Sequence, residues 1–584
     1  MRTLADRPPV VPDGHDPLAT PPRWRRSRPG RRSSGGRASG GRSWQALVLG
    51  VAALVVLPVL VIVGSVADPS TDVWRQLAET GQLAEMATDT AGLLLMVGAG
   101  TLVLGAGLAW LTFAHTFPGS RLLGWLLVLP LAMPGYVLGF VTLSVFGFTG
   151  PLQGGLRAVF GAEVAVPDLR SLWGASLVLT LTLYPYVYLL ARAALREQAA
   201  AGYEVARTFG HGPLAAARRV VLPLARPSLA AGLTLVAMEA LTDFATVQYF
   251  NVKTLTVGVY EVWKGMFDRD AASELAALVL AVAVVILGVE RLLRGRRRYD
   301  QPGTSRRMEP TPLRGWRGWT ATGVCVAVLA VAFAAPVGQL VVWAITDAAG
   351  GPGLSSRYLG YLANSGLLAV AAAVLAVAAA AAIVNGARFA GTRSADAAAQ
   401  LSTVGYALPG PVVAIGVLLV LAGLDRALDA VGLGVPGLAV TGSVLGLVYA
   451  YAVRFLALGI GSVGASLSKV PVDLTDSARV LGAPPRRILR RIHLPLTSSG
   501  LVVALLLVAV EALKELPIVL LLRPFGFDTL SVWVWQLASD SRWESAALPA
   551  LTIVVVSLVP VALLFRRLVP HPGQEDAADL EVFT

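Results

Sequence analysis

Apolar segments of about 20 residues recur along most of the chain and are separated by short polar stretches. A segment of this length crosses the hydrocarbon core of a bilayer as one helix. Twelve such spans are predicted, and the pattern therefore indicates an all-α membrane protein. The spans are 44–67, 90–114, 122–147, 171–193, 227–250 and 271–293 in the first half, and 319–345, 365–387, 398–424, 441–466, 498–521 and 545–566 in the second.

Composition agrees with a membrane protein. Of the 584 residues, 55% are hydrophobic and only 14% are charged, whereas soluble domains are about a quarter charged. The net charge of +12 lies mostly in Arg-rich tails and loops, which indicates contact with anionic lipid headgroups rather than with nucleic acid. A single cysteine, Cys325, and five scattered histidines exclude a disulfide within the chain and a Cys or His metal cluster.

Polar segments divide the chain into domains. Residues 1–43 hold ten Arg and almost no large aliphatic side chains, so a disordered basic cytoplasmic tail is predicted. Residues 44–293 form a first transmembrane domain, and the basic segment 294–318 is a cytoplasmic linker. Residues 319–567 form a second transmembrane domain, and 568–584 a C-terminal cytoplasmic tail. Twelve spans place both termini on the same side of the membrane.

The two halves repeat each other, and their best-matched segments lie at a fixed offset of 272 residues. E-V-A-R-T-F-G-H-G-P-L-A-A-A-R-R-V-V-L-P at 204–223 returns as D-S-A-R-V-L-G-A-P-P-R-R-I-L-R-R-I-H-L-P at 476–495, and E-A-L at 239–241 returns at 511–513. Because each half has six spans, an even number, both copies have the same orientation in the membrane. The fold expected is two parallel six-helix repeats that form a pseudo-dimer, with a pathway along the shared axis.

Each copy of the repeated loop reads as a helix, a sharp turn and a second helix. Its glycine can take the left-handed conformation that ends a helix, and a proline three residues later suits the first turn of the next. The proline at the end of each copy is expected to end or kink that helix. Positive charge gathers on this side, which indicates the cytoplasm. The residues are Gly210, Pro213 and Pro223 in one copy and Gly482, Pro485 and Pro495 in the other.

The spacing of acidic-x-Ala, Gly and Leu-Pro resembles the EAA loop of binding-protein-dependent ABC importer permeases. The copies depart from it with Val205, Ser477 and Asp476. The resemblance implies the type I ABC importer permease fold, in which each loop is a coupling helix held in a cleft of a separate ATPase subunit. The acidic residue would contact the ATPase, the glycine would set the docking angle and the arginine would anchor the loop. The loop residues so implied are Glu204, Ala206, Arg207, Gly210 and Pro223, and Asp476, Ala478, Arg479, Gly482 and Pro495.

The resemblance also implies the partners. They are two copies of a cytoplasmic ABC ATPase, an extracytoplasmic solute-binding protein and the lipid of a bacterial plasma membrane. No G-x-x-x-x-G-K-[ST] motif occurs in the chain. The chain is therefore expected to bind no cofactor and to be no enzyme by itself, with ATP hydrolysed on another subunit. An ion-coupled secondary transporter is the alternative from another class, although its repeats are often inverted.

Five charged residues fall within the fifth and eleventh predicted spans. A charge in hydrocarbon costs about 2.5–3.5 kcal/mol or more, so such residues normally face a partner or a water-filled cavity. Glu511 and Lys514 stand at i, i+3 and could pair on one helix face; a role in the translocation pathway is the alternative. Carboxylates suit a hard cation without identifying the metal. The five residues are Glu239, Asp243, Glu511, Lys514 and Glu515.

Two further features bear on mechanism and cargo. Pro-Gly pairs at 134–135 and 409–410 interrupt apolar spans; a packing kink is expected, and a gate is the alternative. The stretches 511–530 and 241–258 resemble the two domains of ferric-iron permeases. That resemblance implies iron as the cargo, with thiamine or polyamine permeases as relatives.

Overall fold

The computed structural model describes residues 39–67, 71–161, 168–196, 203, 206, 208–210, 212–294, 310–350, 355–432 and 440–568. The tail predictions for residues 1–38 and 569–584, and the linker prediction for 295–309, lie outside this part. The segment 39–43, assigned from sequence to the N-terminal tail, belongs to the first helix.

The described chain is almost entirely helical. The first half contains α1 (Ser39–Ser65), α2 (Thr71–Glu79), α3 (Gln82–Thr101), α4 (Gly107–Ala114), α5 (Ser120–Leu126), α6 (Gly135–Phe146), α7 (Pro151–Phe160), α8 (Leu172–Ala194), α10 (Pro213–Ala216), α11 (Leu222–Thr242), α12 (Ala245–Tyr249), α13 (Leu255–Glu261) and α14 (Arg269–Arg294). The second half contains α15 (Trp316–Leu329), α16 (Ala335–Gly350), α17 (Ser356–Ala390), α18 (Arg393–Leu401), α19 (Gly410–Ala430), α20 (Val444–Ser468), α21 (Val472–Val480), α22 (Pro485–Ile488), α23 (Leu494–Leu496), α24 (Ser498–Lys514), α25 (Pro517–Leu522), α26 (Leu530–Ser539) and α27 (Trp543–Leu568). A two-residue parallel pair, β1 (His115–Thr116) with β2 (Thr311–Pro312), ties the start of the second half to the end of α4.

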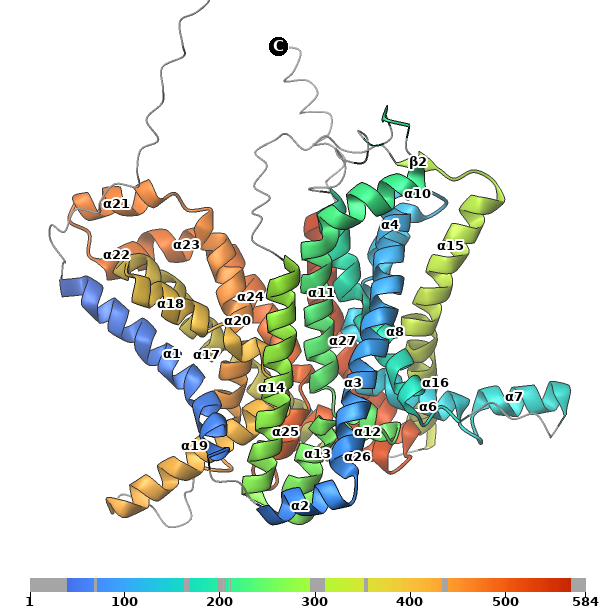
Figure 1. Ribbon diagram of the computed structural model, residues 1–584, viewed down its shortest axis with the longest axis horizontal. Helices are drawn as coiled ribbons and strands as arrows, with labels where there is room; N and C mark the ends of the chain where they lie inside the picture. Colours follow the sequence, from blue (N-terminus) through green and yellow to red (C-terminus); the bar gives the residue numbers. More distant parts are fainter. Residues whose placement is uncertain are drawn as a thin grey trace, which may run out of the picture.

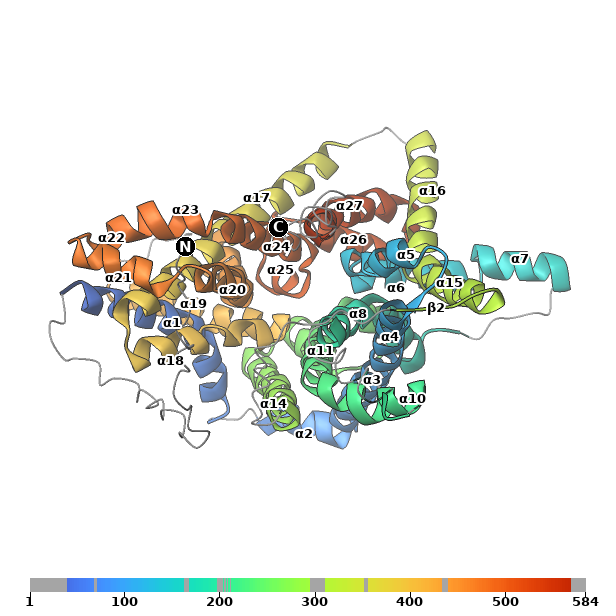
Figure 2. The same ribbon diagram turned by 90° about the horizontal axis from the view of Figure 1, so that it is seen from above.

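Within the described residues, 11 helices are long and apolar enough to cross a membrane, or 12 if the bent pair 485–496 and 498–514 counts as one span. This confirms the prediction of an all-α membrane protein with about 12 spans. Figure 1 shows α10 and α21–α23 at the same, upper end of the molecule, and Figure 2 shows them on opposite sides of it. We call this end the loop end.

The first helix of each half packs against the other half. α1 contacts α17 and α19 of the second half, and α15 and α16 contact α5 and α6 of the first. Two glycines of the second half let α1 pack closely against it. A Cβ on Gly416 would lie 2.7 Å from the Pro58 carbonyl oxygen, and a Cβ on Gly386 would lie 2.6 Å from Val48 Cγ2. The halves are therefore interlocked.

The third and ninth spans, predicted at 122–147 and 398–424, are interrupted at their Pro-Gly pairs, but by more than the kink that was expected. α5 and α18 end early, short 3₁₀ turns at 129–132 and 404–407 follow, and new helices begin at Gly135 and Gly410. Pro134 and Pro409 have ψ of 141° and 142°, an extended conformation that cannot continue a helix. Each Pro-Gly pair is thus a helix start and not a kink within one helix.

The fifth and eleventh spans also break, so the predicted continuations to residues 250 and 521 were wrong. α11 ends at Thr242 and α24 at Lys514, and the next residues, Asp243 and Glu515, are extended with ψ of 108° and 123°. The chain then continues as short helices, α12 with α13 and α25 with α26. Asp243 and Glu515 therefore lie in helix breaks, where their side chains can cap the next helix.

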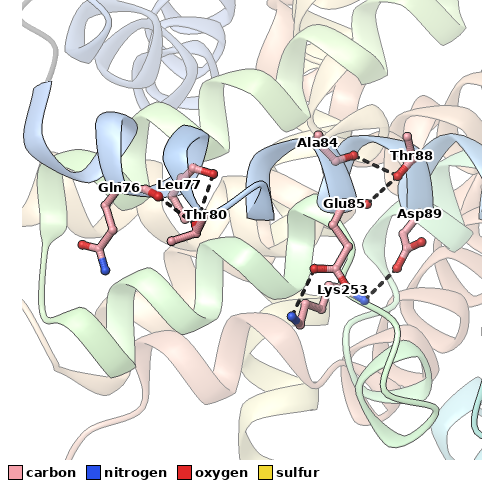
Figure 3. Close-up of polar contacts among 8 residues, drawn as sticks. All are labelled: Gln76, Leu77, Thr80, Ala84, Glu85, Thr88, Asp89 and Lys253. Atoms are coloured by element: carbon pink, nitrogen blue, oxygen red, sulfur yellow. Dashed lines mark hydrogen bonds and ion pairs between the residues drawn. The ribbon is translucent and has the colours of Figure 1, made fainter.

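Polar contacts fasten the first of these breaks to the start of α3 (Figure 3). The Lys253 backbone N–H donates to Asp89 Oδ2 at 3.2 Å, and Lys253 Nζ pairs with Glu85 Oε2 at 3.1 Å. Two residues further on, the Leu255 backbone N–H donates to Thr90 Oγ1 at 3.0 Å. The segment after the break is therefore held by the neighbouring helix.

The second half repeats this fastening. Leu530 N donates to Ser365 Oγ at 2.8 Å, and both residues stand 275 positions after their counterparts in the first half. Asn364 Nδ2 donates to the Asp528 carbonyl oxygen at 3.0 Å. The same device thus fixes both broken helices, because a hydroxyl satisfies a backbone N–H that the break leaves without a helical partner.

Candidate functional site

A cavity of about 110 Å³ lies where the two halves meet. It has room for several water molecules. α6, α8 and α11 of the first half line it together with α20, α24 and the α24–α25 break of the second. All five charged residues singled out from the sequence line it: Glu239, Asp243, Glu511, Lys514 and Glu515.

The predicted pair on α24 is present. Lys514 Nζ lies 2.7 Å from Glu511 Oε1, with both side chains partly exposed, at 14% and 26%. This confirms the local pairing expected from their i, i+3 spacing. The pairing and the alternative role in translocation are compatible, since both residues line the cavity.

The two carboxylates at the helix breaks cap the short helices that come next in the chain. Asp243 Oδ1 accepts from the Thr246 backbone N–H at 2.8 Å, and its Oδ2 accepts from Thr246 Oγ1 at 2.7 Å. Glu515 Oε1 accepts from the Ile518 backbone N–H at 3.3 Å. Each carboxylate therefore stabilises a helix N-terminus while also lining the cavity.

Arg454 is a further charged residue of the site that the sequence reasoning missed. It lies inside α20, and its Nε is 3.2 Å from Glu515 Oε2, with exposures of only 6% and 5%. Its NH1 also donates to the Leu408 carbonyl oxygen at 3.4 Å. The criterion that selected the other five, a charge within an apolar span, selects Arg454 as well.

The Pro-Gly glycines stand directly against these carboxylates. A Cβ on Gly135 would come 2.5 Å from Asp243 Oδ2, and a Cβ on Gly410 would come 2.8 Å from Glu515 Oε1 and 2.9 Å from Arg454 NH1. Only a residue without a side chain fits this approach. The two glycines thus let the starts of α6 and α19 reach the cavity wall.

Far from the loop end, the halves touch through Trp535 of α26. Its Nε1 donates to Gln248 Oε1 at 3.2 Å, and its carbonyl oxygen accepts from Tyr249 Oη at 3.3 Å. Its ring also lies 6.1 Å from that of Phe244 and 6.2 Å from that of Tyr260. These contacts join α26 to α12 and α13 across the interface.

The turns of both repeated loops have the predicted geometry. Gly210 and Gly482 have φ of 81° and 78°, which confirms the left-handed conformation, and α10 and α22 begin at Pro213 and Pro485. In the first loop, Ala206 is buried at 4% exposure, whereas Glu204 and Arg207 lie outside the described residues.

In the second loop, Arg479 NH1 pairs with Asp476 Oδ1 at 3.1 Å, and Arg479 NH2 lies 3.5 Å from the carbonyl oxygen of Phe389 at the end of α17. Asp476 is exposed and Ala478 is half-buried. The arginine thus ties its loop to a membrane helix, while the acidic residue faces outward, where a partner can reach it.

Pro223 does not end its helix, and the alternative that it kinks the helix stays a prediction. α10 passes through a π-helical segment at 217–221 directly into α11, with Pro223 in the first turn of α11. The π segment allows this because a proline at the start of the next α-helix lacks only an N–H that would be poorly paired there. Pro495 lies in the first turn of α23, just before the chain bends by 74° into α24.

A polar network that the sequence did not reveal buries one end of the second loop. His493 Nδ1 lies 2.6 Å from Asn385 Oδ1, and His493 Nε2 lies 3.0 Å from Thr475 Oγ1. Asn385 Nδ2 donates to the Ala381 carbonyl oxygen, which leaves Oδ1 to accept from the imidazole Nδ1–H. The ring also stacks on Phe389 at 5.2 Å. These residues are far apart in the sequence, so no local signal could have found the network.

The cavity is not a closed metal site. Across the described residues, no group of three or more His, Cys, Asp or Glu is arranged to hold a metal ion. Its lining does carry four carboxylates against one Arg and one Lys, a formal charge of −2 when all are ionised. Such an arrangement attracts cations without forming a complete coordination sphere.

Comparison with known proteins places the chain in a family. The family described as "Binding-protein-dependent transport system inner membrane component" matches residues 101–294 and 379–571, more than half of the chain. The Fe(3+)-transport system permease protein FbpB 2 of Haemophilus influenzae is 25% identical over 525 residues, 89% of this chain and 97% of that protein.

Two further relatives cover less than half of the chain. A probable molybdenum ABC transporter permease protein of Haloferax volcanii is 27% identical over 265 residues, 44% of this chain and 93% of its own length. The sulfate transport system permease protein CysT of Salmonella typhimurium is 33% identical over 190 residues, 32% of this chain and 67% of its own.

Proposed function

This chain belongs to the family of binding-protein-dependent transport system inner membrane components, and we propose that it is the fused two-domain permease of an ABC importer for ferric iron. Two copies of a cytoplasmic ATPase would dock on the repeated loops, and an extracytoplasmic binding protein would deliver the ion. ATP would be hydrolysed on the ATPase subunits, and the permease itself would bind no cofactor. The loop end would then face the cytoplasm of a bacterium, with both termini on that side.

The observation that carries the proposal is the cavity between the halves. In an alternating-access cycle, motion of the loops against each other would open the interface first at one end and then at the other, with the cavity in the middle. Its formal excess of two carboxylates gives a cation a favourable place to pause. A relative that spans nearly the whole chain is an Fe(3+)-transport system permease protein.

The same cavity argues against a bare oxyanion, although sulfate and molybdenum permeases are relatives. Two like charges 4 Å apart repel by about 4 kcal/mol at an effective dielectric constant of 20. A sulfate or molybdate ion beside excess carboxylates would therefore be excluded. Thiamine and polyamines are cationic, so cavity charge alone does not separate them from iron.

Reconstitution with an ATPase subunit and a panel of loaded binding proteins tests the proposal. Ferric iron on its binding protein should stimulate ATP hydrolysis and enter the vesicles, whereas sulfate, thiamine and spermidine on theirs should do neither. Stimulation and uptake with one of the other cargoes, and none with iron, would contradict it. Uptake without any ATPase would instead favour an ion-coupled secondary transporter.

A further inference from the structure

The cations of the cavity are confined to the second half of the chain. The repeat offset of 272 residues pairs each charged position of one half with a position of the other, and all eight positions line the cavity. Carboxylates occur in both halves, but where the second half has its two cations the first has threonines. The pairs are Glu239 with Glu511, Asp243 with Glu515, Thr182 with Arg454, and Thr242 with Lys514.

Both cations contact carboxylates of their own half. Arg454 Nε lies 3.2 Å from Glu515, and Lys514 Nζ lies 2.7 Å from Glu511. Each contact offsets one negative charge. The repeat therefore brings four carboxylates together, and the two cations present only in the second half offset the charge of two of them. The formal charge of the cavity is thus −2, whereas it would be −4 if threonines stood at both cation positions, as they do in the first half.

A second observation points to a ligand in this cavity. Tyr136 lines it and is only 5% exposed, yet its hydroxyl has no hydrogen-bond partner among the described residues. Asp243 and Glu515 line the same cavity. Buried polar groups are normally paired, so a phenolic oxygen without a partner in a cavity that carboxylates also line is suited to a hard cation or its bound water.

We propose that Arg454 and Lys514 set the charge selectivity of the cavity. By offsetting two of the four carboxylates they leave two negative charges in excess, which together with the Tyr136 hydroxyl favour a multivalent cation. A pathway must bind its ion firmly enough to admit it and weakly enough to release it. Four uncompensated carboxylates would hold a trivalent ion too tightly, and a neutral cavity would not admit it. This inference rests on the proposed function and names what selects its cargo.

Exchanging residues between the matched positions tests the proposal. The probe is Tb³⁺, a hard trivalent ion, added to the purified full-length permease and detected by emission sensitised by nearby aromatic rings. Thr242→Lys, which lowers the excess to one charge, should weaken Tb³⁺ binding at least tenfold, and Thr242→Met, of similar bulk but neutral, should weaken it much less. Thr242→Lys combined with Lys514→Thr moves the cation to the other half and should regain most of the affinity. Lys514→Thr alone should tighten binding, which misfolding could not do.

Equal losses in Thr242→Lys and Thr242→Met would overturn the proposal, because bulk and not charge would then decide binding. A double variant no better than Thr242→Lys, or a wild-type protein that binds no Tb³⁺, would also overturn it. Failure of the proposed function gives a different result. In that case Tb³⁺ binding would follow the predicted order, but reconstituted wild-type permease would take up no ferric iron from its binding protein.

Discussion

Replacing Arg454 by Met should lower the free energy of unfolding by about 3 kcal/mol, because the change leaves Glu515 as an uncompensated buried charge. The two side chains are only 6% and 5% exposed, and their charged atoms are 3.2 Å apart. At an effective dielectric constant of 20, charges at that distance attract by about 5 kcal/mol. The Ile518 N–H, which also donates to Glu515, still stabilises the carboxylate and places the loss near the lower end of the usual range of about 3–5 kcal/mol.

The assay is unfolding of the purified protein in mixed micelles by increasing SDS, followed by tryptophan fluorescence. The matched control is Arg454→Met with Glu515→Gln, which removes both charges and keeps an acceptor for the Ile518 N–H. It should recover about 2 kcal/mol of the loss, since charged contacts of this kind couple by about 0.5–3 kcal/mol. Equal losses in the single and double variants, or a loss below about 1 kcal/mol in the single one, would refute this account of the pair.

The remaining predictions concern close approach, the helix break and the contact between the halves. Gly410→Ala should destabilise the protein by about 1–3 kcal/mol and reduce uptake, because its Cβ would overlap a carboxylate oxygen 2.8 Å away. The control is Gly423→Ala on the same helix, whose Cβ would meet nothing within 4 Å and which should be neutral or stabilising. Equal effects of the two variants on unfolding would contradict the packing argument. Thr90→Val removes the acceptor of the Leu255 N–H, so hydrogen–deuterium exchange at 251–258 should rise, with a loss of about 1–3 kcal/mol, and unchanged exchange would count against the fastening role. Trp535→Ala should raise cargo-independent ATP hydrolysis of the reconstituted importer several-fold by loosening the contact between the halves, and an unchanged basal rate would show that this contact does not restrain opening.

Much of the fold could be predicted from the sequence because the two strongest signals, apolar length and internal repetition, do not depend on local backbone conformation. Apolar length gave the spans, and the offset of 272 residues gave the parallel repeat. The breaks at Asp243 and Glu515 could not be placed, since the apolar run continues through each break and hydropathy does not depend on backbone conformation. The π segment before Pro223 was missed for a similar reason, because a proline marks a helix start as readily as a helix end.

Part of the cavity could be predicted because charge within an apolar span is costly wherever it occurs. Glu239 and Glu511 could be placed near a shared axis from their matched positions alone. Arg454 satisfies the same criterion, because it lies within the predicted span 441–466. The contact of His493 with Asn385 spans 108 residues and depends on how α17 packs on the second loop, which a single sequence does not encode locally.

The most direct test of the central claim, that separate ATPases drive this permease through its two loops, is ATP-dependent iron uptake by reconstituted Gly210→Pro plus Gly482→Pro permease. Both glycines have φ near 80°, and proline is fixed near −65°, so neither turn can form. The variant should insert normally, fail to retain the ATPase during purification and lose uptake. Uptake equal to that of the wild type, with the ATPase still bound, would contradict the claim.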